Sequence, residues 1–327
     1  LEYDASGNPL GLLIEEARTN GLLRSELIGS TSWMSAAVLI SQDATTAPDG
    51  SNTATSLIST AATGEHFTQQ AGTNTAATET FSVYAKPNGF NYLFLRTNLD
   101  SSWLTGYASF NVATGELGVV GPSIDSTTIT YAGNGWYRCS MTFDNRNGAV
   151  AQLHAKPTDT ASSASTGDGV NGLYLWGAQV ESGSFPTSYI PTSGSTVTRA
   201  KDLASLPVER FAYNQPQGTV VAFQETFGTA GNLVPWEIHT ANTNRIVYNA
   251  KSSTATIITG GSVQASLNHA DQLPSVFYKQ GLAFKKDDIA SSLDASILTD
   301  TSGTIPTVSS FKIGTDYSLL AMLNGHI

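Results

Sequence analysis

The sequence predicts an all-β protein made of two tandem antiparallel β-sandwich domains. Apolar and polar residues alternate along short segments, which is the pattern of strands with one buried face. Turn-forming residues such as Pro87-Asn88-Gly89 and Gly133-Asn134-Gly135 separate these segments. Their spacing of about 8–15 residues is typical of a sandwich. Charged residues make up 13% of the chain, about half the usual ~25%, which excludes a coiled coil or long helical bundle.

The expected strands of the first domain are residues 80–85, 91–96, 107–112 and 136–143. The one helical candidate, residues 25–37, lacks a clear amphipathic stripe. Residues 157–172 are rich in Ser, Thr, Gly and Asp and read as a solvated loop. Two prolines then extend the chain near residues 186–191. We therefore place the first domain at residues 1–195 and the second at residues 196–327.

A second series of alternating segments follows this boundary. Its expected strands are residues 218–224, 244–248, 275–278, 281–285 and 310–314. The net charge of the chain is −10, and no basic face is available for phosphate backbones or anionic lipids. Nucleic acid is therefore excluded as a partner, and no apolar run reaches the ~18–20 residues of a membrane span. The single cysteine, Cys139, forms no intrachain disulfide.

Six segments in the same order resemble a module found in virion proteins of tailed bacteriophages and prophages. These proteins are tail fibres, tailspikes and head-surface fibres. Three of the segments contain the patterns APDG, SVYAK and GNGWYR. The six are Gly11–Asn20, Ala47–Ala54, Phe81–Lys86, Gly133–Arg138, Trp176–Glu181 and Phe185–Thr192. The resemblance covers about 200 residues and implies a jelly-roll domain of the carbohydrate-binding type.

The second part resembles a concanavalin A-like or laminin-G (LamG) sandwich. The residues that carry this resemblance are Gly218–Val221, Leu298–Gly314 and Asn324–Ile327. The last of these is similar to the start of the final strand in that class, so we expect this domain to be C-terminally incomplete. Taken together, the two resemblances imply a virion surface protein, located on the tail fibre or capsid and extracellular after release. They imply a homo-oligomer, with a trimer favoured, whose partners are host polysaccharide and other virion proteins.

The sequence does not predict an enzyme. It contains no Walker A loop, no His-Glu-x-x-His and no Gly-x-Ser-x-Gly. The five histidines have no metal-ligand spacing, and we interpret them as ordinary surface or loop residues. Adjacent acids such as Glu15 and Glu16 point to opposite faces of a strand, so they cannot flank one glycosidic bond. A distant pair such as Glu116 with Asp144 stays open.

Aromatic residues are the main functional candidates, because sugar C–H faces stack on rings while amides and carboxylates bond the hydroxyls. Trp103 is the leading candidate, since residues 98–103 are polar and loop-like. The alternative for each ring is packing within its own sandwich. The candidate carbohydrate-binding residues are Trp103, Tyr92, Tyr107, Asn98, Asp100 and Trp236, with Trp33 as a further aromatic.

No cofactor is predicted, although calcium sites are common in such jelly rolls. Asp49, Asp168 and Glu181 are the candidate calcium ligands, and turn or surface roles are the alternative for each. Three functions remain open at this point. The chain is a glycan-binding adhesion protein, a purely structural or capsid-decorating protein, or a polysaccharide depolymerase.

Overall fold

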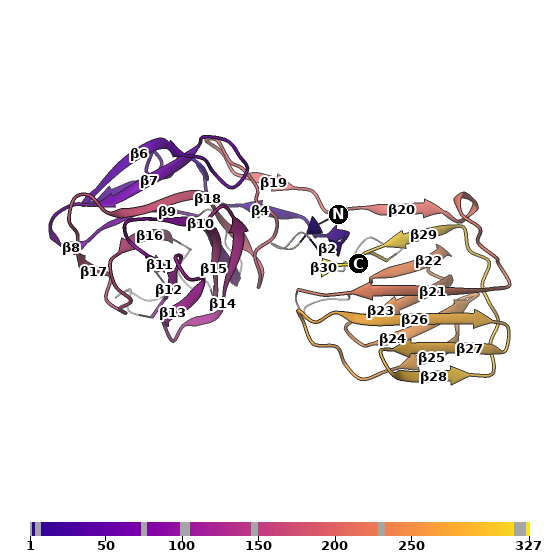
Figure 1. Cartoon of the computed structure of the whole chain (residues 1–327). Coiled ribbons are helices and arrows are strands. Elements are labelled where there is room, and N and C mark those ends of the chain that lie inside the picture. The colour runs from indigo at the N-terminus through magenta and orange to yellow at the C-terminus, as the bar shows by residue number, and fades with distance from the viewer. Residues whose placement is uncertain are drawn as a thin grey trace. The chain divides into compact units, whose positions relative to one another are not determined.

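A computed structural model describes residues 2–3, 8–72, 77–98, 105–144, 150–227, 233–316 and 325–327. Within these ranges the regular structure is β-strand apart from one 3₁₀ turn, η1 (Val208–Arg210). The chain divides into two compact units, one of residues 18–199 and one of residues 1–17 and 200–327. Each unit has two antiparallel sheets around a shared core (Figure 1). The prediction of an all-β fold with antiparallel sandwiches is confirmed.

The 18–199 unit contains two six-stranded sheets, named here for one central strand each. The β10 sheet has the order β14 (Ile124–Gly133), β15 (Trp136–Asp144), β10 (Thr78–Asn88), β18 (Gly172–Ser182), β7 (Ala54–Ser59) and β6 (Val38–Thr45). The β11 sheet has the order β13 (Glu116–Val120), β12 (Tyr107–Asn111), β11 (Tyr92–Arg96), β16 (Val150–Lys156), β9 (Phe67–Ala71) and β5 (Met34–Ala36). Four of these strands, β10, β11, β12 and β15, are those predicted from alternation.

Alternate residues of the two sheets form the core of this unit. Phe81 and Val83 of β10 meet Leu93 and Leu95 of β11, and none of the four is exposed to solvent. Full burial of each such side chain contributes roughly 1.5–3 kcal/mol relative to exposure. Cys139 lies in the same core, and burial raises the pKa of its thiol. The cysteine therefore acts as a small apolar side chain.

Asn20 fixes the entry of the chain into this unit. Its Nδ2 donates to the carbonyls of Ala178 (3.2 Å) and Ile190 (2.9 Å). Its Oδ1 accepts from the backbone N–H groups of Leu22 (3.1 Å) and Val180 (3.2 Å). Because Asn20 is fully buried, these four bonds satisfy backbone groups that water cannot reach. Asn20 itself ends β4 (Arg18–Asn20), which pairs with β19 (Val197–Arg199). Elsewhere in this unit, β8 (Thr63–Glu65) pairs with β17 (Ala164–Thr166).

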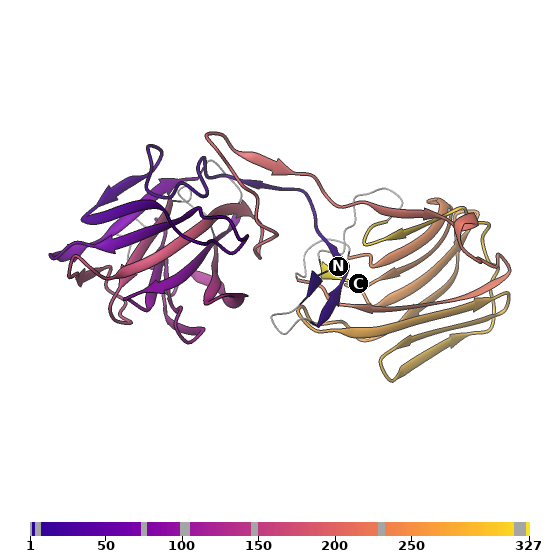
Figure 2. The same ribbon diagram turned by 45° about the horizontal axis from the view of Figure 1, so that its top comes forward.

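The second unit has a six-stranded and a four-stranded sheet, seen as two layers in Figure 2. The β22 sheet has the order β20 (Ala204–Pro207), β29 (Ser310–Ile313), β22 (Trp236–Ala241), β23 (Asn244–Asn249), β24 (Thr254–Thr259) and β25 (Ser262–Asn268). The β21 sheet has the order β21 (Gln217–Gln224), β26 (Tyr278–Lys285), β27 (Asp288–Leu293) and β28 (Ser296–Asp300). Trp236 and Tyr248 from one sheet pack with Leu282 and Phe284 from the other.

Residues 1–17 group with the second unit, whereas the sequence placed them in the first domain. Ile14 is buried against Leu12, Ala204 and Ile327. The backbone N–H of Glu15 donates to Asp202 Oδ2 at 2.9 Å. Two short pairings complete this region, β3 (Leu13–Ile14) with β30 (Gly325–His326) and β1 (Glu2–Tyr3) with β2 (Pro9–Gly11). The pairing of β3 with β30 joins residues more than 300 positions apart and therefore leaves no local pattern in the sequence.

The predicted helix over residues 25–37 is wrong. The segment forms turns, with hydrogen bonds from Ser30 N to Leu27 O (3.1 Å) and from Trp33 N to Ser30 O (2.7 Å), followed by β5. Ser25 instead bonds to Tyr189 and Thr192, which lie far along the chain. Tertiary hydrogen bonds therefore override the local propensity here. No helix in the described ranges is long and apolar enough to span a membrane.

The Asn20 contacts predict a large effect of Asn20→Ala on stability. Four buried backbone groups would lose their partner, and each unsatisfied group costs about 1–3 kcal/mol. We expect the unfolding transition of the full chain, followed by tryptophan fluorescence in urea, to move to clearly lower urea. Asn52→Ala is the matched control, because exposed Asn52 makes one side-chain bond, to Asp43 O at 3.0 Å. Equal effects of the two substitutions would contradict the assigned role of Asn20.

Candidate functional site

The candidate site is the face of the β11 sheet that points away from the core. Strand alternation sends Leu93 and Leu95 inward, so Tyr92, Phe94 and Arg96 lie on the opposite face. The strand register adds further residues to this face from both neighbours of β11. They are Tyr107, Ser109 and Asn111 of β12 and Gln152, His154 and Lys156 of β16.

A row of four rings crosses this face from strand to strand. The ring centroids of Phe67 and His154 are 5.7 Å apart, and those of His154 and Phe94 are 5.4 Å apart. Tyr107 stacks on Phe94 at 5.4 Å with an interplanar angle of 18°. Phe94 and His154 are buried, whereas Phe67 and Tyr107 are half-buried. The row therefore ends in a partly accessible ring on β12.

Two predicted residues, Tyr92 and Tyr107, lie on this same face of neighbouring strands. Both are half-buried, and Asn111 Nδ2 lies 3.5 Å from the Tyr92 hydroxyl as its donor. Asn98, a third predicted residue, follows β11, and its Oδ1 accepts from the backbone N–H of Val150 at 3.1 Å. The two tyrosines lie at opposite ends of the β11–β12 pairing, because Tyr92 is opposite Asn111 and Tyr107 is opposite Arg96. The side-chain Oδ1 of Asn98 holds the start of β16.

Residues 157–163, named here the strap, cross this face from β16 toward β13. Lys156 Nζ donates to Thr160 O (2.6 Å), to Thr160 Oγ1 (2.8 Å) and to Ser162 O (2.6 Å). Asp159 Oδ1 accepts from the backbone N–H of Val119 on β13 at 3.1 Å. The buried Lys156 ammonium also lies 4.4 Å from the centre of the Phe94 ring. The strap therefore covers the Lys156 end of the face.

An ion pair lies on the β9 side of the face. Arg96 Nη1 donates to Glu65 Oε1 at 2.9 Å and to Gln152 Oε1 at 3.4 Å. Ser163 Oγ donates to the same Glu65 oxygen. Arg96 is buried, while the Glu65 side chain remains 43% exposed. Charge-assisted bonds of this kind fasten the end of the strap to β8.

Burial lowers the pKa values of the two basic groups under the strap, His154 and Lys156. Desolvation lowers the pKa of His154 well below its ordinary value, and the charges of Arg96 and Lys156 lower it further. Desolvation also lowers the pKa of Lys156 to about 8, against an opposing effect of Asp159. His154 Nε2 lies 2.9 Å from Gln152 Oε1, which accepts only, so Nε2 carries the proton. His154 Nδ1 has no hydrogen-bond partner among the described residues.

The remaining aromatic candidates lie elsewhere. Trp236 is fully buried in the core of the second unit, where its Nε1 donates to Gln280 Oε1 at 2.8 Å. Trp33 is buried in the first core, and its Nε1 donates to Arg24 O at 2.9 Å. Burial leaves neither ring a face on which a sugar could stack. Trp103 and Asp100 lie outside the described residues.

Each of the three candidate calcium ligands accepts hydrogen bonds from residues close to it in the sequence. Asp49 Oδ1 accepts from Ser51 N and Oγ in a turn. Asp168 accepts from the backbone of Asn171 and Val170, and these bonds lower the pKa of the carboxyl. Glu181 is buried and accepts from Gln179 and Thr187. Across the residues that the structure describes, no three His, Cys, Asp or Glu side chains gather as a metal site would require.

The carboxylate pair left open by the sequence is divided between the two sheets. Glu116 is on β13 of the β11 sheet, where Oε2 accepts from Thr114 Oγ1 at 2.9 Å. Asp144 ends β15 of the β10 sheet. The two residues therefore share neither a strand pair nor a sheet.

The sequence interpretation missed the basic and amide groups of the face. The interpretation of the histidines as surface or loop residues is wrong for His154 and His239, which are buried within β16 and β22, while His66 and His269 lie outside the strands and are also buried. The signal for His154 was present, because Leu153 and Ala155 alternate with it along residues 150–156. The sequence does not show that the strap folds over this face and buries the outward-pointing side chain of His154.

The low pKa of His154 predicts a specific pH dependence of stability. The unfolded chain binds a proton at His154 near pH 6.5, whereas the folded chain resists it, so stability falls as the pH drops below that value. The slope for this one group approaches about 1.4 kcal/mol per pH unit. We expect His154→Phe to flatten the loss of unfolding free energy between about pH 7 and pH 5. Parallel pH profiles for the two proteins, measured by urea denaturation, would refute this account.

Comparison with known proteins identifies no family for this chain. No family model matches the chain, and no curated protein matches it. Among solved structures, the chain is similar to domains LG4-5 of the mouse laminin alpha1 chain. The identity is 9% and the TM-score 0.30, over 100% of this chain and 89% of that chain. The fold class therefore rests on the strand pairing described above.

Proposed function

We propose that this chain is a surface protein of a tailed-phage virion and that it attaches the particle to host polysaccharide. The six segments resembling phage fibre and tailspike proteins support the virion assignment. In this proposal the protein lies on the tail fibre or capsid surface and becomes extracellular on release. Its partners are a host glycan and other virion proteins.

The observation that supports glycan binding best is the pair of tyrosines on the β11 sheet. Tyr92 and Tyr107 are accessible rings on adjacent strands, and the Asn111 amide lies beside Tyr92. Sugars need an apolar ring for their C–H face and amide or hydroxyl groups for their hydroxyls. In the β11–β12 register Tyr107 is opposite Arg96, four residues from Tyr92 and roughly 13 Å along the strand, so a glycan of several sugar units is needed to reach both rings.

The face favours weak binding at each copy. Arg96, Gln152 and Lys156 already bond to Glu65, His154 and the strap, so few strong donors remain for a sugar. A homo-oligomer, with the trimer favoured by the resemblance, compensates for this weakness. Several linked copies raise avidity by about 10²–10⁴ without new contacts.

A structural role without sugar binding is the second candidate function. The observation that favours it is the same strap, because Phe94 and His154 are covered by the chain itself. In that case Tyr92 and Tyr107 contribute to packing and to contacts between virion proteins. The proposal includes no catalytic step. Release of reducing ends from a bound polysaccharide would point to a depolymerase instead.

Substitution of the tyrosines tests the adhesion proposal. We expect Tyr107→Ala and Tyr92→Ala each to weaken binding to the responding polysaccharide by roughly tenfold, the loss of one stacking contact of ~1.4 kcal/mol. The measurement is titration of the full chain on an array of bacterial surface polysaccharides. Tyr131→Ala is the matched control, because Tyr131 is an exposed tyrosine on β14 of the other sheet.

Three outcomes separate the candidates. Loss of binding for the two β11-sheet variants but not for Tyr131→Ala supports the assigned face. Equal binding by all four proteins to a responding glycan removes this face as the site. No binding of the wild-type chain to any polysaccharide on the array, with full stability retained, favours the structural role.

A further inference from the structure

Strand β21 is an outermost strand of its sheet, and its pairing with β26 is regular along its whole length. All eight of its residues pair with β26, from Gln217 opposite Lys285 to Gln224 opposite Tyr278, without a register shift. Among the described residues, no strand pairs with its other side. An edge of this kind presents a row of backbone N–H and C=O groups that can accept another strand.

The other outermost strands of the four larger sheets carry protective features. The pairings of β14, β6, β13 and β25 contain register shifts. The remaining three, β5, β20 and β28, span five residues or fewer. Proteins use such shifts, short strands, charges and prolines to block edge-to-edge pairing. Within the described ranges, β21 has neither a shift nor a charge nor a proline.

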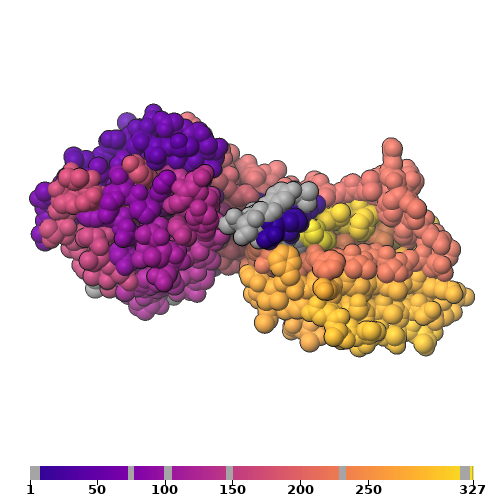
Figure 3. Space-filling view, in the orientation of Figure 1, coloured from indigo at the N-terminus to yellow at the C-terminus, as the bar shows by residue number. Residues whose placement is uncertain are grey.

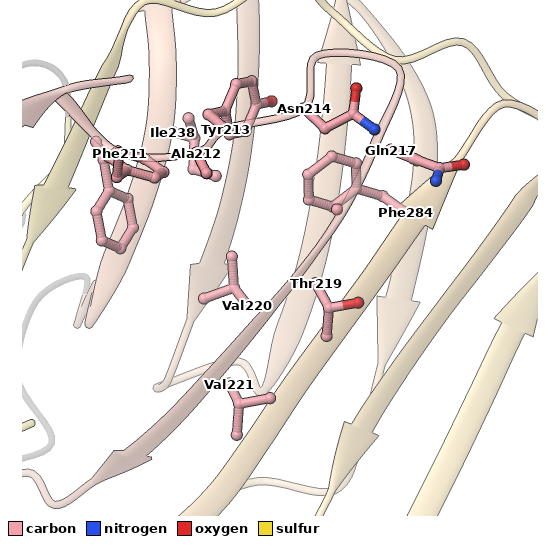
Figure 4. A pocket seen from close by; sticks show the side chains of 12 residues that line it. Phe211, Ala212, Tyr213, Asn214, Gln217, Thr219, Val220, Val221, Ile238 and Phe284 are labelled. Atoms are coloured by element: carbon pink, nitrogen blue, oxygen red, sulfur yellow. The ribbon is translucent and has the colours of Figure 1, made fainter. Parts of the chain in front are cut away.

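A groove runs along the inner side of this edge. It has a volume of about 390 Å³, and Figure 4 shows Val220 and Phe284 on one side with Phe211, Tyr213 and Ile238 on the other. The groove is lined entirely by uncharged residues. The space-filling view shows the surface hollowed between β20 and β21 (Figure 3). Phe211 is 38% exposed at this groove, whereas Ile238 and Phe284 are buried.

The outward face of β21 is also apolar. The exposed fraction is 64% for Val221 and 57% for Phe223. Both faces of one strand are thus uncharged in a protein whose net charge is −10. Two copies repel each other over most of their acidic surface, and an uncharged edge is the place where they can approach. The strand is self-complementary in charge, because an identical strand paired antiparallel with it opposes only uncharged residues.

We propose that β21 pairs antiparallel with β21 of a second copy about a two-fold axis at Val221. In this register Val221 faces its own counterpart, and Thr219 faces Phe223 on the outer surface. Val220 faces Ala222 on the inner surface, where the partner's strand covers part of the groove. Every opposed pair from Gly218 to Gln224 is uncharged. The four-stranded sheets of two copies become one continuous sheet.

This contact is isologous and closes at two copies, so it gives a dimer. The trimer implied by the resemblance would need a different interface. The inference does not depend on sugar binding, because it uses the other unit of the chain. Failure of one proposal therefore leaves the other intact.

Sedimentation velocity of the full chain, from about 1 to 200 µM, tests the pairing. We expect a reversible monomer–dimer equilibrium for the wild type. Val221→Lys and Val221→Glu each place like charges face to face and should weaken association by roughly tenfold or more. Ile297→Lys is the matched control, because Ile297 is 70% exposed on β28 at the opposite edge of the same sheet.

Mixing the two charged variants tests the register itself. The ammonium of Val221→Lys would face the carboxylate of Val221→Glu only if Val221 lies on the axis, so we expect the one-to-one mixture to regain dimers. Unchanged near-ultraviolet circular dichroism shows that each variant is folded. A monomeric or trimeric wild type overturns the proposal. Dimers that survive Val221→Lys, or a mixture that stays monomeric, also overturn it.

Discussion

The buried carboxylate of Glu181 is the contact on which the 18–199 unit depends. Gln179 Nε2 donates to it at 2.5 Å, and Thr187 donates through its backbone N–H at 2.9 Å and its hydroxyl at 2.6 Å. A buried charge is tolerated only when donors surround it. Gln179 Oε1 in turn accepts from Ile190 N at 2.7 Å. Residues 185–192 are thereby fixed along β18 without forming a strand themselves.

Three side chains from the recognised segments fasten loops to the β10 sheet. Trp136 Nε1 donates to Thr46 O (3.2 Å), and Trp176 Nε1 donates to Thr53 Oγ1 (3.0 Å). Arg138 Nη2 donates at 2.6 Å to the backbone carbonyl of Thr187, the residue that also bonds to Glu181. These contacts concern the β10 sheet, whereas the candidate site lies on the opposite sheet. The segments therefore bear on the fold more directly than on a ligand.

Strand positions could be predicted where alternation is clear, but the expected strand over residues 275–278 is wrong, because residues 275–277 form a turn and an irregular segment that lead into β26. Residues 80–85 and 136–143 each fall inside one observed strand, β10 and β15. The site could be predicted only in part. Alternation shows which side chains share one face of a strand, but it does not show which other parts of the chain cover that face. Tyr92 and Tyr107 lie half-buried on the outward face of the β11 sheet, and their contact with a sugar stays a prediction. The sequence does not distinguish the buried Trp236 from these tyrosines. Its neighbour Glu237 is polar, and a polar residue in the sequence is equally compatible with exposure to water and with an ion pair such as the one with Arg245.

The candidate site and the β21 edge differ in what they leave for a partner. Hydrogen bonds within the chain occupy Arg96 and Lys156, so a glycan gains mainly ring contacts and few charge-assisted bonds. In the proposed glycan site, such contacts give modest affinity for one copy, and several copies acting together raise the avidity. The open, uncharged edge of β21 belongs to the unit that lacks this face. The two proposals therefore use separate sheets, and each can be tested by substitutions that leave the other sheet unchanged.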